Sequence, residues 1–246
     1  MKFKDHMRQI TETIFVPIHP AGWPFILIFA FVSIMLAMIE DDLGFLGLVL
    51  TAWCVYFFRN PDRTVPQRKG LIVSPADGIV SMITKAPLPA ELEVLDEKDP
   101  LYSGQELTRV SVFLNVFDVH VNRNPIEGTV TQAVYHPGKF LNATLDKAST
   151  DNERNTLVVD IADQKSSIAF VQIAGLVARR ILCDAKVGDV LKTGERYGMI
   201  RFGSRTDIYL PPVTEPMVSI GQRKNGGETV IADMKSKEGA RKGEIV

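Results

Sequence analysis

The chain has 246 residues, and its 46% of hydrophobic residues is enough to form a buried core. Its 28 basic and 29 acidic residues leave a formal net charge of −1, so the strongly basic surface of a nucleic-acid-binding protein is absent, and we expect no nucleic-acid partner. The two cysteines and four histidines form no CxxC or HExxH pattern, so we expect no metal site.

Two apolar runs near the N-terminus are predicted to form helices. Residues 21–39 carry no charge and have about the length needed to cross roughly 30 Å of bilayer hydrocarbon. Residues 43–58 form a second, slightly shorter run. Only Glu40, Asp41 and Asp42 separate the two runs, so two crossings would form a tight transmembrane hairpin.

The distribution of charge predicts the side of the membrane on which the rest of the chain lies. Basic residues precede the first apolar run and follow the second, whereas the connecting turn is only acidic. By the positive-inside rule, we expect attachment to the cell membrane with the remaining chain on the cytoplasmic side. A hairpin that lies in the interface, or one buried in a soluble core, is the alternative. A signal peptide is disfavoured because a second apolar run follows the first.

After this membrane anchor, which we assign to residues 1–66, residues 67–246 are predicted to form a β-rich catalytic domain. Short apolar runs alternate there with Gly, Pro, Asn and Asp, as in a mainly β (α+β) fold. Residues 87–99 alone suggest a short helix or a loop. The expected strands are 70–73, 78–84, 108–114, 128–135, 155–161, 167–173, 179–183, 198–202 and 207–210.

One stretch also suggests the type of β fold. KVGDVLKTGERYGMIRFG places glycines as the turns of lipoyl and biotinyl carrier domains do, and these domains are flattened β-barrels or sandwiches. We therefore expect a barrel-like or sandwich-like domain that resembles a lipoyl/biotinyl hybrid fold. A noncatalytic carrier-like binding module is one functional alternative, although no Lys lies in the hairpin-tip setting that a carrier needs.

Three residues could carry chemistry: Asp77 in SPADG, His120 in FDVHVNRNP and Ser204 in FGSRTD. Together they could supply the orienter, base and nucleophile of a catalytic triad. Taken singly, each also has an ordinary explanation, as a turn aspartate, a hydrogen-bonded histidine and a loop serine. A membrane-anchored serine hydrolase that uses these three residues is therefore a second hypothesis.

An ordered set of motifs resembles the phosphatidylserine decarboxylases. The motifs FRNPDRTVP, SPADGIV, FDVHVNRNPIEG, YHPGKFLNA, DNERN and a Gly-Ser pair occur in the order of that family and at compatible spacing. The short length and the FGSR sequence resemble the compact bacterial and archaeal branch. The resemblance implies a proenzyme that converts phosphatidylserine to phosphatidylethanolamine. A related enzyme that acts on a soluble amino acid is less consistent with the apolar hairpin.

The resemblance further implies self-cleavage between Gly203 and Ser204. Ser204 would attack the carbonyl of Gly203, and elimination followed by loss of ammonia would leave a covalent pyruvoyl group at position 204. The substrate amine would form a Schiff base with this group, which acts as the electron sink that pyridoxal phosphate (PLP) provides elsewhere. Neither PLP nor a metal is then expected. His120, oriented by Asp77, would be the base for cleavage and the later proton donor.

Further expectations concern the surroundings of this site. Arg201, Arg205 and Arg123 are candidate ligands of the substrate phosphate, because a guanidinium matches phosphate in geometry and charge. Longer relatives carry a second histidine where this chain has Arg123, so His136 is a candidate for a missing base. The cleaved C-terminal chain, residues 204–246, is expected to stay bound, and the resemblance suggests a homodimer.

Overall fold

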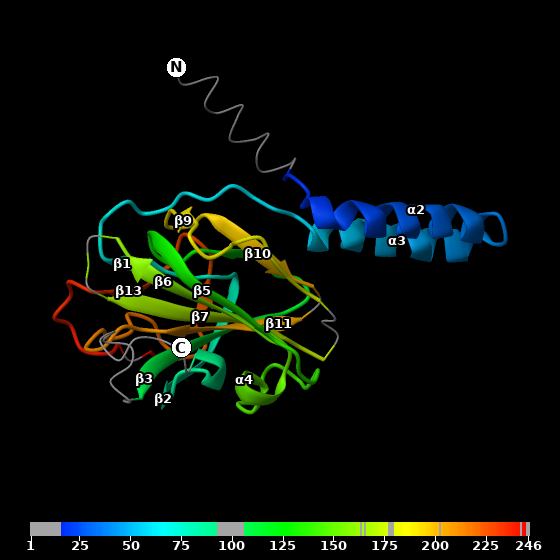
Figure 1. The fold of residues 1–246 in the computed structure, drawn as a ribbon. Coiled ribbons are helices and arrows are strands. Elements are labelled where there is room, and N and C mark those ends of the chain that lie inside the picture. Colours follow the sequence, from blue (N-terminus) through cyan, green and yellow to red (C-terminus); the bar gives the residue numbers. More distant parts are fainter. Residues whose placement is uncertain are drawn as a thin grey trace, which may run out of the picture. The chain divides into compact units, whose positions relative to one another are not determined.

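The computed structural model divides the chain into two compact units, Met1–Asp62 and Arg63–Val246 (Figure 1). The first unit contains the 3-10 helix η1 (Pro20–Gly22) and the helices α2 (Trp23–Ala37) and α3 (Asp41–Phe57). The described residues of the whole chain are 16–92, 106–162, 164, 166–176, 180–201, 203–241 and 243–244.

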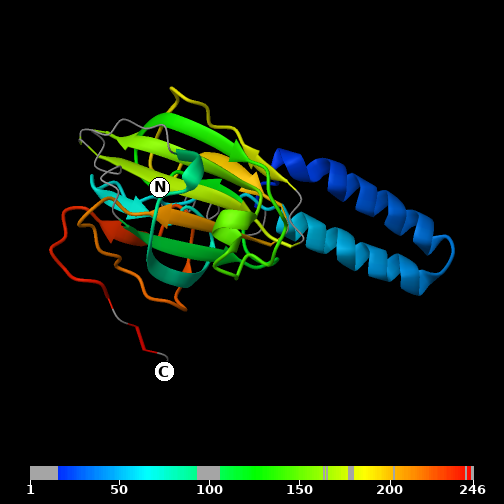
Figure 2. The same ribbon diagram turned by 60° about the horizontal axis from the view of Figure 1, so that its bottom comes forward.

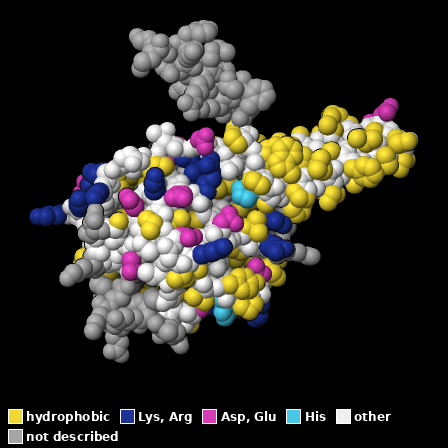
Figure 3. Space-filling model, turned by 45° about the horizontal axis from the view of Figure 1, so that its top comes forward, with side chains coloured by type: hydrophobic (Ala, Val, Ile, Leu, Met, Phe, Trp, Pro, Cys, Tyr) yellow, Lys and Arg dark blue, Asp and Glu magenta, His cyan; other side chains and the backbone are white. Residues whose placement is uncertain are grey.

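Helices α2 and α3 pack along each other within the first unit. Gly47 of α3 allows this close approach, because a Cβ there would collide with Ser33 of α2. The hydroxyl groups of Ser33 and Thr51 share a hydrogen bond of 3.0 Å across the pair. Large apolar side chains cover the outside of both helices (Figure 3). An exposed apolar surface of this extent is typical of one that contacts lipid or another protein.

Among the described helices, one stretch is long and apolar enough to cross a membrane, namely Pro20–Ala37. Helix α3 begins at Asp41 and so includes two acidic residues that we had placed in the turn. Asp41 and Asp42 suit that position, because negative charge in the first turn interacts favourably with the helix dipole. Their presence shortens the uncharged part of α3.

The second unit is mainly β, as predicted. It also contains the 3-10 helix η2 (Ala90–Leu92) and the short helix α4 (Ala148–Asp151). Its strands are β1 (Leu71–Val73), β2 (Gly78–Ala86), β3 (Leu107–Leu114), β4 (Val121–Arg123), β5 (Gly128–His136), β6 (Arg154–Ile161), β7 (Ser167–Ala174), β8 (Ile181–Cys183), β9 (Val190–Leu191), β10 (Arg196–Ile200), β11 (Ser204–Tyr209), β12 (Arg223–Lys224) and β13 (Val230–Asp233).

Eight of these strands form one curled antiparallel sheet in the order β12-β2-β3-β11-β7-β6-β5-β9 (Figure 1 and Figure 2). The remaining strands pair as β1-β13 and as β4-β10-β8. Both faces of the large sheet are buried at its centre. Ile168 and Phe170 of β7 belong to one hydrophobic cluster, whereas Ala169 and Val171, which point the other way, belong to a second. Strands β7 and β11 are therefore central.

All nine predicted strands are present, with ends that differ by at most three residues. The important correction is β11, which begins at Ser204 rather than at Asp207. Its neighbours β3 and β7 pair with Ser204 from both sides, at Leu114 and Ala174, and thereby extend the strand. The prediction for residues 87–99 is met by η2 as far as Leu92, and residues 93–99 lie outside the described part of the chain.

Candidate active site

Ser204 is a fully buried residue at the start of the central strand β11. Pairing with β3 and β7 fixes its backbone from two sides. Its Oγ has no hydrogen-bond partner among the described residues. A buried hydroxyl group normally has a partner, and leaving one without a partner costs about 1–3 kcal/mol. Ser204 is therefore a buried strand residue rather than the loop serine that its sequence setting also allowed, and its hydroxyl is a candidate nucleophile.

Gly203 precedes Ser204 in a left-handed backbone conformation, with φ of 68°. A Cβ at this position would meet no described atom within 4 Å. The conformation, and not lack of space, is therefore what favours glycine here. At Gly175, just after β7, lack of space is what requires glycine, because a Cβ there would collide with the carbonyl oxygen of Gly203. The end of β7 thus packs directly against the Gly203–Ser204 peptide.

His120 brings a basic nitrogen to the backbone N–H of Gly203, the residue that precedes Ser204. The backbone N–H of Gly203 donates to Nε2 of His120 at 3.2 Å, and Nδ1 lies 3.0 Å from the carbonyl oxygen of Asp118. Because a carbonyl oxygen can only accept, Nδ1 carries the hydrogen and Nε2 holds the lone pair, so the imidazole is neutral. His120 is completely buried. Nε2 of His120 thus contacts the residue that directly precedes Ser204 in the sequence.

Asp118 is a site residue that the sequence reasoning missed. Its carbonyl fixes the tautomer of His120, and its own carboxylate is held by the backbone N–H of Asn115 at 2.9 Å and by Arg223 at 2.5 Å. Asn115 in turn accepts from the N–H of Phe117 at 2.8 Å. Asn and Asp three residues apart are a signal for such a turn. That signal was present in the sequence NVFD.

Asp77, the predicted orienter of His120, has a buried carboxylate that binds two described groups. Oδ2 accepts from Nη2 of Arg63 at 2.7 Å, and Oδ1 accepts from the backbone N–H of Gly226 at 2.7 Å. These bonds tie a segment on the C-terminal side of Ser204 to residues on its N-terminal side. The role of Asp77 as an orienter stays a prediction.

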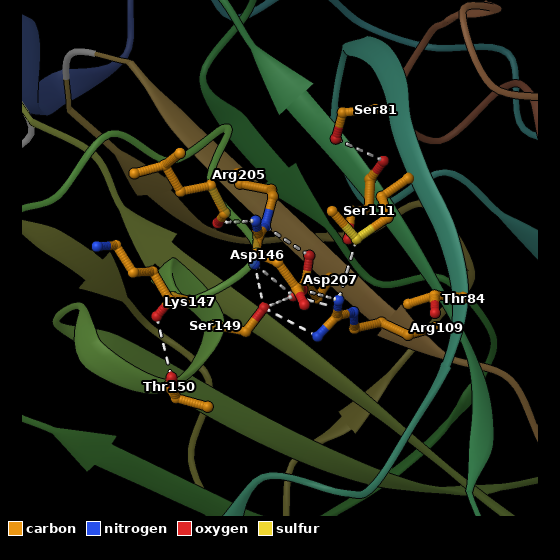
Figure 4. A network of polar contacts seen from close by, with 12 residues as sticks. Ser81, Thr84, Arg109, Ser111, Asp146, Lys147, Ser149, Thr150, Arg205 and Asp207 are labelled. Atoms are coloured by element: carbon orange, nitrogen blue, oxygen red, sulfur yellow. Dashed lines mark hydrogen bonds and ion pairs between the residues drawn. The ribbon is translucent and has the colours of Figure 1, made fainter.

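Arg205 lies next to Ser204 but points into the protein (Figure 4). It is fully buried, its Nη1 donates to the carbonyls of Ala143 and Leu145 at 2.9 and 2.8 Å, and its Nε forms an ion pair of 2.9 Å with Asp207. A phosphate that arrives from solvent would have to displace all of these contacts. Arg205 therefore holds the loop of residues 137–147 against β11, and we leave it out of the phosphate site.

We call the contacts of Arg205 with Ala143, Leu145 and Asp207 the Arg205 clamp. The carboxylate of Asp207 organises a larger buried network around this clamp (Figure 4). Ser149 donates to Oδ2 of Asp207 at 2.7 Å, and Arg109 donates to Ser149 at 3.1 Å. Burial alone would lower the pKa of Arg109, but the carboxylates of Asp207 and Asp146 raise it. Burial and the charge of Asp207 also raise the pKa of Tyr209 to about 12. Arg109 therefore keeps its positive charge at neutral pH, and Tyr209 keeps its hydroxyl proton.

The other predicted phosphate ligands differ in their surroundings. Arg123 is buried and donates to the carbonyl of Gly194 at 2.9 Å. Arg201 is half-buried, and burial together with the positive charge of Arg180 lowers its pKa. Two guanidinium groups that repel each other make binding of an anion between them favourable. Arg201 with Arg180 is thus the better candidate, and Arg180 was missed by the sequence reasoning.

His136, the candidate for a missing base, is the last residue of β5 and pairs with Arg154 of β6. None of the described contacts joins His136 to Gly203 or Ser204. Within the described part of the chain, His120 is thus the histidine whose side chain contacts Gly203, through its backbone N–H.

Comparison with known proteins is consistent with this site. The sequence matches the family model described as phosphatidylserine decarboxylase over residues 50–232. Proteins named phosphatidylserine decarboxylase proenzyme are similar over almost their full length. The protein of Cereibacter sphaeroides is 59% identical, over 96% of this chain and 97% of the relative. That of Ruegeria pomeroyi is 56% identical, over 92% and 99%, and that of Rhodospirillum rubrum is 59% identical, over 92% of each.

Proposed function

This chain belongs to the phosphatidylserine decarboxylase family, and we propose that it is a proenzyme that cleaves itself and then decarboxylates phosphatidylserine to phosphatidylethanolamine. The observation that carries the proposal is the arrangement around two adjacent residues. Ser204 offers a buried hydroxyl without a described partner, Gly203 has a left-handed backbone, and Nε2 of His120 accepts a hydrogen bond from the backbone N–H of Gly203.

Self-cleavage begins when Oγ of Ser204 attacks the carbonyl carbon of Gly203. The C–N bond of the peptide breaks, an ester links the two residues, and the nitrogen of Ser204 becomes a free amine. Loss of the Cα proton of Ser204 then expels the Gly203 carboxylate, and water replaces the nitrogen, which leaves as ammonia. We propose that Nε2 of His120 accepts the Oγ proton after it releases the N–H of Gly203; the contact of Nε2 with the residue before Ser204 supports this role.

The site fits the pyruvoyl group that this reaction would leave at position 204. The side chain there is buried between two paired strands, with no competing hydrogen bond among the described residues, so bulk water is kept away. The group supplies the electron sink for loss of the substrate carboxyl group. His120 then provides a nitrogen that can deliver a proton to the substrate, and Arg201 with Arg180 attracts the lipid phosphate.

The remaining parts of the proposal concern the anchor and the assembly. We propose that α2 and α3 cross the cell membrane as a hairpin and that the second unit lies on the cytoplasmic side. The apolar exterior of both helices supports this arrangement, as do the acidic residues where α3 begins, Glu40, Asp41 and Asp42. We also propose that the β unit resembles lipoyl/biotinyl hybrid folds. We further propose that the protein assembles into a homodimer. After cleavage, residues 204–246 are held by the pairing of β11 with β3 and β7.

The serine hydrolase alternative is less favoured by the geometry. In a resting hydrolase, the histidine nitrogen accepts the hydrogen bond of the serine hydroxyl. Here the N–H of Gly203 occupies Nε2 of His120, and Oγ of Ser204 has no described partner.

A direct test is conversion of phosphatidylserine in detergent micelles by the purified full chain, with phosphatidylethanolamine measured by mass spectrometry. The wild type and a control variant, Ser236→Ala in the C-terminal tail, should form the product, whereas Ser204→Ala should form none. Product formation by Ser204→Ala would contradict the proposal. So would a wild type that decarboxylates only free serine, or one that hydrolyses the lipid esters.

A further inference from the structure

Large apolar side chains are exposed on each of the loops that meet at the Gly203–Ser204 peptide. We call the four of them the apolar rim: Phe117, Phe140, Leu145 and Leu176. Their exposed fractions are 59%, 36%, 44% and 69%. A single exposed apolar residue is ordinary, but several around one site indicate a contact surface.

Contacts within the protein place these loops at the site. Leu176 follows Gly175, whose Cα packs against the carbonyl of Gly203. Ala143, which precedes Leu145 by two residues, lies 3.5 Å from where a Cβ of Gly175 would be.

Hydrogen bonds also connect the loops of the apolar rim to the site. Arg205, the neighbour of Ser204, holds the carbonyls of Ala143 and Leu145. Phe117 directly precedes Asp118, whose carbonyl binds His120. The loops that carry the apolar rim are thus anchored to the groups that surround the scissile peptide.

Positive charge accompanies the apolar rim. Arg180 and Lys147 are exposed, and each lies within four residues of a rim residue in the sequence. Protein interfaces are depleted in lysine, whereas exposed apolar side chains combined with Lys and Arg are typical of surfaces that enter the headgroup region of anionic membranes. The combination therefore favours a lipid surface over a protein partner.

We propose that the apolar rim inserts into the interface of an anionic bilayer, so that a lipid headgroup reaches position 204 while its acyl chains stay in the membrane. The inference rests on the proposed function, because it explains how the site receives a lipid substrate. It goes further in assigning membrane contact to loops of the β unit, separately from helices α2 and α3.

A reporter placed on the rim tests membrane contact without any measurement of activity. A polarity-sensitive fluorophore is attached to the full chain through Leu176→Cys or Val190→Cys. Both variants also carry Cys54→Ser and Cys183→Ser, so that only the new cysteine is labelled. The labelled proteins are placed in phosphatidylcholine–phosphatidylglycerol vesicles. Val190 in β9 is a matched control, with an exposed fraction of 68%. The reporter at 176 should shift to the blue and be quenched by nitroxide lipids, and the reporter at 190 should not. If both reporters sense water, or if both sense lipid, the inference is wrong.

A second test separates this inference from the proposed function. Leu176→Asp and Val190→Asp are compared on long-chain phosphatidylserine in vesicles and on a short-chain form dissolved as monomers. For Leu176→Asp, the ratio of kcat/KM on vesicles to kcat/KM on monomers should fall about tenfold or more, since a buried apolar contact is replaced by a charge. An unchanged ratio would overturn the inference. A wild type inactive on both substrates would instead refute the proposed function, and the reporter would still decide whether the rim meets the membrane.

Discussion

The Cα of Gly175 packs so closely against the carbonyl oxygen of Gly203 that a Cβ at position 175 would collide with this oxygen. The carbonyl carbon attached to it is the atom that Ser204 must attack. We therefore predict that Gly175→Ala slows self-cleavage by about 100-fold, because displacing a reacting group by roughly 1 Å has effects of that size. A time course of chain cleavage on denaturing gels measures this rate. Gly239→Ala, at a position with open space, is the control, and equal rates for the two variants would refute this role of Gly175.

His120 is expected to act in both self-cleavage and decarboxylation. It is the histidine that a described contact joins to Gly203, the residue before Ser204, and its Nε2 holds the lone pair. His120→Ala should slow cleavage by about 10²–10⁴-fold, the usual contribution of a general base. Slow maturation should eventually yield cleaved protein whose decarboxylation rate can be measured by itself. His136→Ala is the matched control, and a larger effect of that variant on cleavage would restore His136 as the base.

The Arg205 clamp should matter for both stability and maturation. A lysine keeps the charge but cannot contact the two loop carbonyls and Asp207 at once, as the planar guanidinium does. Arg205→Ala leaves the buried Asp207 without this partner and should lower the free energy of unfolding by about 3–5 kcal/mol.

Both effects can be measured on the full chain. Thermal unfolding of Arg205→Lys and Arg205→Ala is compared with that of Arg241→Lys, a change at an exposed position. Cleavage of Arg205→Lys should be slower than that of the control. Wild-type stability in Arg205→Ala would show that the clamp is dispensable.

Arg201 is expected to act on substrate binding. Burial and the nearby charge of Arg180 lower the pKa of Arg201, and a bound phosphate would relieve that repulsion. Arg201→Ala should raise KM for phosphatidylserine about tenfold, with a smaller effect on kcat, because a charge-assisted hydrogen bond to phosphate contributes about 1.5–3 kcal/mol. Steady-state kinetics on micellar substrate provide the measurement. A change in kcat alone would place Arg201 in another role.

The ion pair of Glu91 with Arg154 predicts how stability depends on pH. Arg154 donates to Glu91 at 2.8 and 2.6 Å, and Thr156 donates at 2.7 Å. Burial alone would raise the pKa of Glu91, but these hydrogen bonds hold it below the ordinary value of 4.5. The pKa of Glu91 is lower in the folded protein than in the unfolded protein. The ion pair therefore stabilises the folded protein fully at pH values above the unfolded pKa. This stabilisation is lost as the pH falls through the folded pKa.

Glu91→Gln should therefore lower the free energy of unfolding by about 3 kcal/mol at neutral pH. The difference from the parent should shrink as pH falls below 4.5. Urea unfolding of both proteins, in a Ser204→Ala background that keeps one chain, measures this difference. A difference that does not change with pH would contradict the assignment.

The sequence reasoning succeeded where local pattern carries the information. Alternating apolar residues and turn residues indicated most strands, and the motifs around His120 and Ser204 indicated two side chains that both lie next to Gly203. It failed where the information lies in pairing between distant segments. The register of β7 against β11 sets Ala174 opposite Ser204 and so brings Gly175 to Gly203. The sequence NVFD indicated the turn at Asp118, but the contact of its carbonyl with His120 and the effect of the Arg180 charge on Arg201 arise only in the folded chain.

Self-cleavage at Gly203–Ser204 is best tested by intact mass spectrometry of the purified full chain beside Ser204→Ala. We expect two chains from the wild type, split after Gly203, and one uncleaved chain from the variant. The smaller wild-type chain should be lighter, by the mass of ammonia, than a chain that begins with unmodified serine, and it should gain mass on reductive amination. A folded, membrane-bound wild type that remains a single chain, or one that splits at another peptide bond, would contradict the account.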